Sequence, residues 1–180
     1  MFSFSYGPSH PGAFTFVTED TPTFDPKGSP RIARLVNAEK AVIDGGGCCL
    51  RLAGLYNLER GAHNYWITNG KPISGSPKTF INQLHYEDAA SACIAALKAG
   101  PEVCKSKIFL FSDGNPMTRI EILECALGND IYKDYSMPEF EETDEEPSAG
   151  HMYENSKTKS DLGWEPKFTW FGGVMSGVSQ

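Results

Sequence analysis

Hydrophobic positions recur at helical spacing over residues 30–44. The expected amphipathic face consists of Ile32, Leu35, Val36, Glu39, Val42 and Ile43. Pro30 suits the first turn of a helix, and Gly45-Gly46-Gly47 provides its end. We therefore predict an amphipathic helix over this stretch.

A continuous apolar run follows the glycines. Residues 48–56 read Cys-Cys-Leu-Arg-Leu-Ala-Gly-Leu-Tyr, which predicts a strand buried on both faces. A second short apolar run, Lys107–Ser112, predicts another buried strand. In α/β sheets, ligands bind beyond the carboxyl ends of the strands, so we expect residues 53–61 to border any small-molecule site.

The other periodic segments are helices with clear end signals. A long helix begins at Tyr86 or Glu87 and ends at Gly100-Pro101, and its expected apolar stripe is Ala89, Ala90, Cys93, Ile94 and Leu97. Pro116 suits the first turn of a helix capped by Asp113 or Asn115, ending at Gly128. Shorter helices are expected at residues 62–68 and 155–162.

The segments between these helices are extended or irregular. We expect strands at residues 2–6 and 80–85, and a long loop over residues 7–28, which is rich in Pro, Gly and Thr. Residues 164–168 read as extended, and the tail beyond them is rich in glycine. Helices and strands therefore alternate, which favours an α/β fold with a parallel sheet and a single domain over residues 1–180. A sheet of so few strands leaves edges that a partner or a second copy could cover.

Composition narrows the classes of partner. The net charge is −7, but six acidic residues lie between Glu139 and Glu146, and the remaining charge is close to balanced. We expect residues 129–150 to form an acidic, flexible loop. The chain shows no basic stripe, which argues against nucleic acid, and no apolar run long enough for a membrane span.

The cysteines and the amino terminus bear on compartment. The five cysteines lack Cys-x-x-Cys pairing and lie mainly in apolar runs, so buried reduced thiols are favoured over metal ligands or disulfides. The first residues lack the basic and apolar regions of a secretory signal. We expect a soluble cytoplasmic protein, although a plastid or another organelle stays open if an amino-terminal part is missing.

Six segments in order resemble one family. They are Tyr6-Gly7, the helix ending at residues 37–42, the strand at 50–56, Asn82–Ala90, the strand and turn at 108–114, and residues 155–167. This order resembles the carboxyl-terminal part of the extended and atypical short-chain dehydrogenases/reductases, the NAD-dependent epimerase/dehydratase superfamily. The resemblance implies the second half of a Rossmann-like parallel sheet with a small substrate-side subdomain.

The resemblance also implies roles for individual residues. It places Ala53, Gly54 and Leu55 beside the nicotinamide of NAD or NADP, although Gly54 could simply end a strand. It places Tyr56, Arg60, Asn82 and His85 on the side of a small-molecule substrate, and Tyr56 could instead simply pack. His85 and Asp88 match an Ile-His-x-x-Asp element, for which a structural role is favoured. Ile81 stands where sugar-nucleotide epimerases often have an arginine that holds a diphosphate.

Two family features are missing. The chain has no Gly-x-Gly-x-x-Gly or similar phosphate-binding turn. The helix over residues 30–44 matches the family's Tyr-x-x-x-Lys helix, but Ala33 and Asn37 stand at the catalytic positions, so we assign no catalytic residue. Tyr153 and Lys157 have this spacing in the wrong segment, and we interpret them as a coincidence.

Two functions therefore stay open. The first is an NAD(P)-dependent epimerase/dehydratase-like protein of the atypical type, truncated or encoded short, whose dinucleotide would need the missing half. The second is a non-catalytic binding or scaffold module derived from the same fold.

Overall fold

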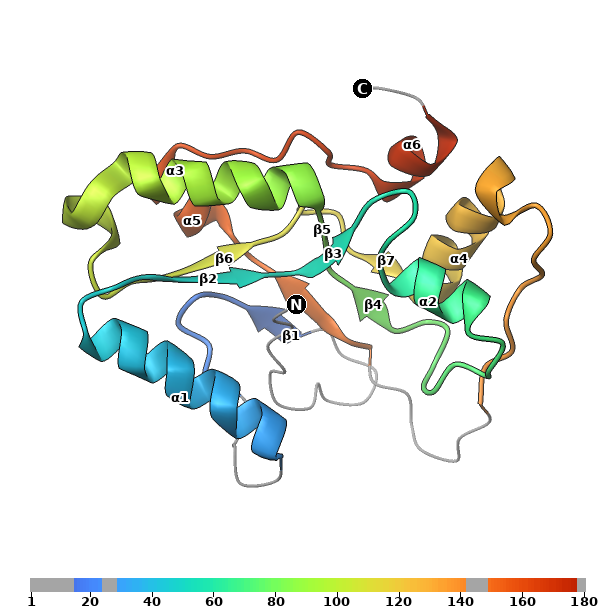
Figure 1. The fold of residues 1–180 in the computed structure, drawn as a ribbon, viewed down its shortest axis with the longest axis horizontal. Coiled ribbons are helices and arrows are strands. Elements are labelled where there is room, and N and C mark those ends of the chain that lie inside the picture. The colour runs from blue at the N-terminus through green and yellow to red at the C-terminus, as the bar shows by residue number, and fades with distance from the viewer. Residues whose placement is uncertain (1–14, 24–28, 142–148, 178–180) are drawn as a thin grey trace.

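A computed structural model describes residues 15–23, 29–141 and 149–177. Its helices are α1 (Pro30–Asp44), α2 (Ala62–Thr68), α3 (Tyr86–Cys104), α4 (Arg119–Leu127), α5 (Ser156–Leu162) and α6 (Phe171–Ser176), with a 3₁₀ turn at Asp130–Tyr132. Its strands are β1 (Thr15–Val17), β2 (Cys49–Leu52), β3 (Gly54–Tyr56), β4 (Phe80–Ile81), β5 (Gln83–His85), β6 (Ile108–Phe111), β7 (Met117–Thr118) and β8 (His151–Tyr153). The α/β class is confirmed (Figure 1).

The strands pair two by two. The pairs β2–β6, β3–β5 and β1–β8 are parallel, and β4–β7 is antiparallel. The expected single strand over residues 48–56 is therefore divided at Ala53, whose N–H donates to the carbonyl of Phe111 at 2.9 Å. Before this residue the chain pairs with β6, and after it with β5, so one run of sequence contacts two neighbours in turn.

Helices α3 and α1 lie on opposite sides of the β2–β6 pair (Figure 1). Helix α1 has the predicted bounds, but none of its residues is fully buried. A buried ion pair ties it to β2: Arg51 donates from Nε to Glu39 Oε2 at 2.9 Å and from Nη2 to Oε1 at 2.7 Å. Arg51 is only 5% exposed, so the sheet residue that interrupts the apolar run holds α1 in place.

The expected stripe on α3 is wrong for four of its five residues. Ala90, Cys93, Ile94 and Leu97 are exposed, and Leu97 is 81% exposed. The buried face consists of Asp88 and three alanines, Ala89, Ala92 and Ala96, which belong to one hydrophobic cluster with Phe109, Phe111 and Trp164. Gly100 has φ 72°, so the helix breaks there as predicted and resumes for a last turn at Pro101.

Three other expectations are corrected. The segment expected to be loop over residues 7–28 contains β1, whose Val17 is fully buried. The helix expected from Pro116 begins at Arg119, because Thr118 caps it with a reciprocal hydrogen-bond box to Glu121. The glycine-rich tail includes α6, whose Phe171 is buried.

The expected acidic loop over residues 129–150 is structured where it is described. Tyr132 is 1% exposed and its hydroxyl donates to Leu58 O at 3.0 Å, while Phe140 forms a bridge with Ile73. Residues 142–148, like the strand expected at 2–6 and Tyr6-Gly7, lie outside the described residues.

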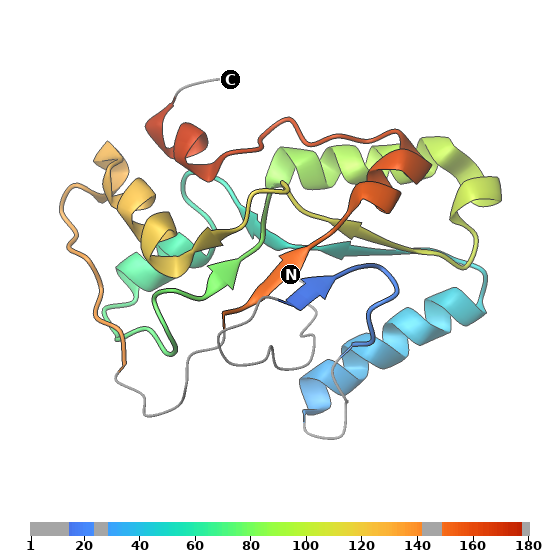
Figure 2. The ribbon, with the colours of Figure 1, turned by 180° about the vertical axis from the view of Figure 1, so that it is seen from behind.

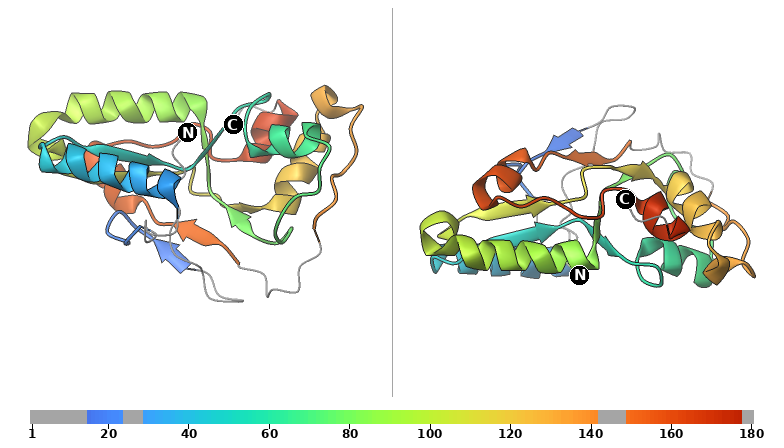
Figure 3. Two further views of the ribbon diagram at one scale, coloured as in Figure 1. Left: turned by 60° about the horizontal axis from the view of Figure 1, so that its bottom comes forward. Right: turned by 90° about the horizontal axis from the view of Figure 1, so that it is seen from above.

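The carboxyl-terminal arm between α5 and α6 connects two hydrophobic clusters. The first cluster lies between α3 and the β2–β6 pair, and the second joins α2, α4 and α6 at the other end of the molecule (Figure 2). The arm runs along α3 (Figure 3), and Trp164 donates from its indole nitrogen to Ser91 Oγ at 2.8 Å. In residues 15–23, 29–141 and 149–177, no helix has the length and apolar character that a membrane crossing requires.

All five cysteines are free thiols. The expected burial holds fully for Cys104, whereas Cys93 is exposed on the outer face of α3. Within the described ranges, no group of three or more His, Cys, Asp or Glu residues could hold a metal ion.

Candidate functional site

Three polar side chains gather where β3, β5 and β6 end. Tyr56 is the last residue of β3, His85 is the last of β5, and Asp113 comes two residues after β6. All three are buried, with 0%, 7% and 3% of their surface exposed. Because β3 and β5 are parallel and in register, Tyr56 lies directly opposite His85. We call Tyr56, His85 and Asp113 the strand-end cluster.

Tyr56 combines a packed ring with a hydroxyl that has no partner. The ring lies 4.9 Å from that of Phe171 and 5.3 Å from the imidazole of His85. Its hydroxyl is buried and makes no hydrogen bond. Burial raises the pKa of this phenol well above its usual value, and the carboxylates of Asp113 and Asp88 raise it further. The hydroxyl is therefore a hydrogen-bond donor without an acceptor.

Asp113 is the acidic member of the cluster. Burial raises its pKa to about 7, against the opposing effect of the Asn115 N–H, which donates to Oδ1 at 2.9 Å. The other carboxyl oxygen, Oδ2, is buried and has no partner. Gln83, whose carbonyl accepts from the Asp113 N–H at 2.8 Å, also has an unpartnered side-chain oxygen. Such a carboxyl group can give or take a proton near neutral pH.

His85 and Asp88 both accept backbone hydrogen bonds that position neighbouring segments. The imidazole Nδ1 of His85 accepts from the Glu87 N–H at 3.3 Å and so caps α3. Asp88 accepts two backbone N–H groups of the carboxyl-terminal arm, from Lys167 at 2.8 Å and from Phe168 at 2.9 Å. Desolvation lowers the pKa of His85, so this ring is neutral at pH 7.

The loop after β3 folds back onto the cluster. Asn57 Oδ1 accepts the N–H groups of Glu59 and Arg60, which closes a tight turn. Gly61 has φ 141°, and a Cβ there would lie 2.9 Å from His63 Nδ1 and 3.0 Å from Tyr56 Cβ, so this close approach requires glycine. The Arg60 side chain is exposed and has no ion-pair partner among the residues that the structure describes.

The side-chain amide of Asn82 is hydrogen-bonded to backbone groups on both of its atoms. Its Nδ2 donates to the carbonyl of His151 at 2.7 Å, and its Oδ1 accepts from the Tyr153 N–H at 2.9 Å. The amide therefore joins β8 to the loop between β4 and β5. We keep its substrate-side role as a prediction, but its polar atoms are already used.

The residues matched to the nicotinamide show no special fit to a dinucleotide. The N–H groups of Ala53 and Gly54 donate to Phe111 O and Asn82 O, at 2.9 and 3.1 Å. A Cβ on Gly54 would lie 3.2 Å from Asn82 O. Glycine at this position therefore allows the backbone of Asn82 to approach closely. Leu55 packs against the first hydrophobic cluster.

The two positions that the resemblance matches to the Tyr-x-x-x-Lys pair hold no titratable side chain. Ala33 and Asn37 both lie within α1, where neither side chain can exchange a proton. Tyr153 lies in β8 and Lys157 in α5, so the two do not share one helix face as a Tyr-x-x-x-Lys pair requires.

Sequence reasoning missed one of the two strongly perturbed groups of the cluster. Asp113 was assigned only as a possible helix cap, and Gln83 received no role. The available signal was an acidic residue directly after a buried strand, at the sheet end where α/β proteins place their ligands.

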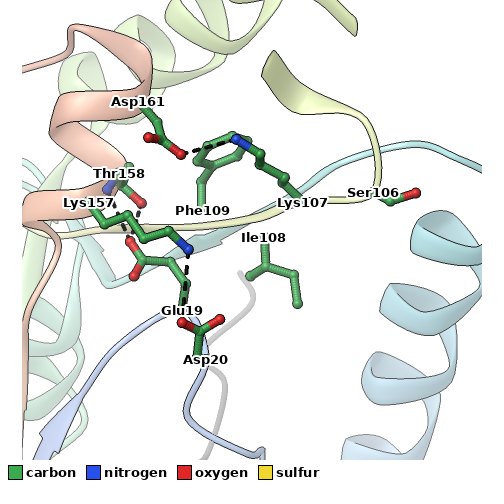
Figure 4. Close-up of a pocket in the computed structure, with 9 residues that line it drawn as sticks. All are labelled: Glu19, Asp20, Ser106, Lys107, Ile108, Phe109, Lys157, Thr158 and Asp161. Atoms are coloured by element: carbon green, nitrogen blue, oxygen red, sulfur yellow. Dashed lines mark hydrogen bonds and ion pairs between the residues drawn. The ribbon is translucent and has the colours of Figure 1, made fainter. Parts of the chain in front are cut away.

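A separate cavity of about 190 Å³ opens near the amino-terminal end of β6 (Figure 4). Its charges are paired with one another: Lys107 with Asp161 at 3.2 Å, and Lys157 with Asp20 at 3.9 Å. Glu19 accepts hydrogen bonds from the N–H and hydroxyl of Thr158. This arrangement fastens β1 and α5 to β6 and leaves no charge directed at a ligand.

The fold and the strand-end cluster define an α/β protein with a polar centre at the carboxyl ends of parallel strands. No family model and no curated protein matches the chain. Solved structures do match it, and they are NAD-dependent epimerases and dehydratases and related proteins, which confirms the resemblance at the level of the fold.

Three examples give the extent of the likeness. A dTDP-glucose 4,6-dehydratase from Bacillus anthracis, in complex with NAD, has a TM-score of 0.69 at 20% identity and matches 95% of this chain and 57% of its own. A UDP-glucose 4-epimerase from Thermotoga maritima, with UDP-glucose, scores 0.70 at 17% identity, covering 97% and 60%. The Bordetella bronchiseptica enzyme WbmG, in complex with NAD, scores 0.65 at 16%, covering 95% and 54%. The chain thus spans less than two thirds of each.

Proposed function

We propose that this chain forms the substrate-side portion of an NAD(P)-dependent protein of the epimerase/dehydratase type, and that the strand-end cluster forms the inner wall of its substrate site. The observation that supports this is the place of the unpartnered atoms. Tyr56 Oη and Asp113 Oδ2 are buried without partners at the carboxyl ends of β3 and β6. In α/β folds, this is where ligands bind.

The cluster supplies complementary proton chemistry. A phenol with a raised pKa stays protonated at neutral pH and can donate a hydrogen bond to a substrate oxygen. The Asp113 carboxyl, with a pKa of about 7, can accept or release a proton under the same conditions. Arg60, exposed on the loop after β3, is the candidate for meeting an anionic group of the substrate.

The proposed substrate is a small polar molecule. The similar structures include one with UDP-glucose, but Ile81 stands where such enzymes often hold the diphosphate with an arginine. A hydrocarbon side chain cannot pair with a phosphate, so we do not extend the sugar nucleotide to this chain.

A non-catalytic binding module is the second candidate. It is favoured by Ala33 and Asn37, which leave α1 without the proton donor and the fixed cation of the redox members. In this case the fold would present its sheet edge to a partner or a second copy.

Titration of the purified chain, followed by amide and side-chain NMR signals, tests both candidates. We expect no saturable binding of NAD(H) or NADP(H) at millimolar concentration, because the chain has no glycine-rich phosphate turn. Micromolar binding would contradict this part of the proposal.

The substrate side is tested with glucose as the probe of a small polar molecule. Saturable changes at Arg60, His85 and the neighbours of Asp113 would support a substrate site. Changes confined to other regions, or no change at all, would favour the binding module.

A further inference from the structure

A cavity with a positive lining lies between the end of α2 and the start of α4. It has a volume of about 430 Å³, and its lining includes Tyr65, Trp66, Asn69, Lys71, Arg119 and Glu141. None of its lining residues belongs to the strand-end cluster, so this cavity is separate from the site proposed above. A neighbouring cavity of about 430 Å³ shares Trp66, Lys71 and Pro72, but its lining also includes Asp134 and Glu139, so the positive charge is confined to the part of the hollow beside Arg119.

The chain holds the Arg119 side chain in a fixed orientation. Its Nη1 donates to the carbonyl of Ser74 at 2.6 Å. Gly75, with φ 90°, lets the loop approach the guanidinium so closely that a Cβ there would lie 2.5 Å from Nη1. On the other side, the guanidinium carbon lies 6.0 Å from the centre of the Trp66 ring.

This oriented cation has no counter-ion. The Nε of Arg119 is buried and makes no hydrogen bond, and no carboxylate in residues 15–23, 29–141 or 149–177 forms an ion pair with it. Burial lowers its pKa, but guanidinium stays protonated in proteins. The Arg119 side chain is half-buried, and its hydrogen-bond partner, the Ser74 carbonyl, carries no net charge, so an incoming anion would supply the missing counter-ion.

The rest of the lining suits a small organic anion. Lys71, also without an ion pair in the described part of the chain, adds a second positive charge, and Glu141 contributes the negative one. Trp66 and the exposed ring of Tyr65 offer flat apolar surface. Guanidinium presents its donors in a planar fork that fits carboxylate and phosphate groups.

We propose that this cavity binds the carboxylate or phosphate group of a small molecule that also carries a flat ring. Arg119 is the principal anion contact, Lys71 strengthens the positive field, and Trp66 and Tyr65 flank the ring. The proposal does not depend on the epimerase/dehydratase function.

The test is an NMR titration of the full chain with phenyl phosphate, benzoate and phenol. We expect saturable shifts of the Arg119 Nε–H and Trp66 indole signals with phenyl phosphate or benzoate, and none with phenol. The two anions separate a phosphate site from a carboxylate site. Equal effects of phenol, or no saturable shift with either anion at millimolar concentration, would overturn the proposal.

Variants locate the interaction. Arg119→Gln should weaken binding roughly 10- to 100-fold, because it removes charge-assisted hydrogen bonds. The affinity of Arg119→Lys should lie between that of Arg119→Gln and that of the wild type. Lys71→Gln changes an exposed residue and should weaken binding only a few-fold. Lys98→Gln, which removes the same charge from α3, is the matched control. Wild-type affinity in both Arg119→Gln and Lys71→Gln would refute the site.

Discussion

At the scale of single residues, Asp113 is the most informative group of the molecule. Its ordinary pKa is about 3.9, and burial raises it to about 7 in the fold. A carboxyl group with a raised pKa favours the folded state while it is protonated. The stability that depends on it is therefore complete below about pH 4 and is lost as the pH rises through about 7.

Asp113→Asn should remove this dependence. We expect the wild-type free energy of unfolding to fall between about pH 4 and pH 7 relative to the variant, by up to about 4 kcal/mol. Asparagine keeps the oxygen that accepts from the Asn115 N–H and carries no charge to desolvate. Urea denaturation across this pH range measures the difference.

The control for this experiment is Asp134→Asn, at an exposed position. Its stability curve should run parallel to that of wild type. If the stability curve of Asp113→Asn also ran parallel to that of the wild type, the buried carboxyl group of Asp113 would not titrate in this pH range.

The sequence predicted the position of these residues at strand ends, but it could not predict their burial or their partners in the fold. Tyr56, His85 and Asp113 each stand at the end of a predicted strand, and the pattern of the chain already directed attention there. The raised pKa of Asp113 depends on burial, and the nearby Asp88 raises it further. Asn82 shows the converse, because its bonds to the distant segment 151–153 could not be expected from its neighbours in sequence.

At the scale of elements, α3 buries a different face from the one that its large apolar residues predict. The helix faces the core with alanines, and Leu97 and Ile94 point outward. A prediction from periodicity alone buries the larger apolar side chain, leucine, before alanine. In α3, however, small side chains occupy the face toward Phe109 and Phe111. By contrast, α1 was predicted to the residue, because proline and glycine fix its ends locally.

Two adjacent substitutions test the register of α3. Leu97→Lys should change the free energy of unfolding by less than about 0.5 kcal/mol, since the residue is already in solvent. Ala96→Lys, one position earlier and buried, should cost several kcal/mol or prevent folding, because it places a charge in the core. Equal effects of the two variants would contradict the buried alanine face.

The contact between α3 and the carboxyl-terminal arm depends on one carboxylate. Asp88→Asn should lower stability by about 2 kcal/mol, because one of the two accepting oxygens becomes an amide that faces an N–H donor. Hydrogen exchange of residues 164–171 should also become faster, as the arm loses its attachment.

The neighbouring Glu87→Gln is the matched control. Glu87 is exposed and lies 3.5 Å from the Lys167 ammonium, so the loss should stay within about 0.5 kcal/mol. If Asp88→Asn leaves exchange in the arm unchanged, other contacts hold the arm.

At the scale of the whole molecule, the two hydrophobic clusters raise the question of cooperativity. Trp164 belongs to the cluster beneath α3, and Trp66 packs against the cluster of α2, α4 and α6. The β3–β5 pair runs between them: Leu84 belongs to the first cluster and Tyr56 to the second. We therefore propose one folding unit.

Tryptophan fluorescence can test this unit. In a variant that keeps only Trp66, and in one that keeps only Trp164, the urea midpoint followed by fluorescence should coincide with the midpoint followed by circular dichroism of the same variant. Two separate transitions would show that the clusters unfold independently, and would divide the chain into two domains.

The β1–β8 pair has a consequence for folding kinetics. Its three residue pairs join Thr15–Val17 to His151–Tyr153, and Glu19 contacts Thr158 across 139 positions of sequence. Closing so long a loop costs conformational entropy, and only the contacts of the completed strand pair offset this cost. The first described strand of the chain must therefore wait for the last described strand, and this pair should be late to form and early to open.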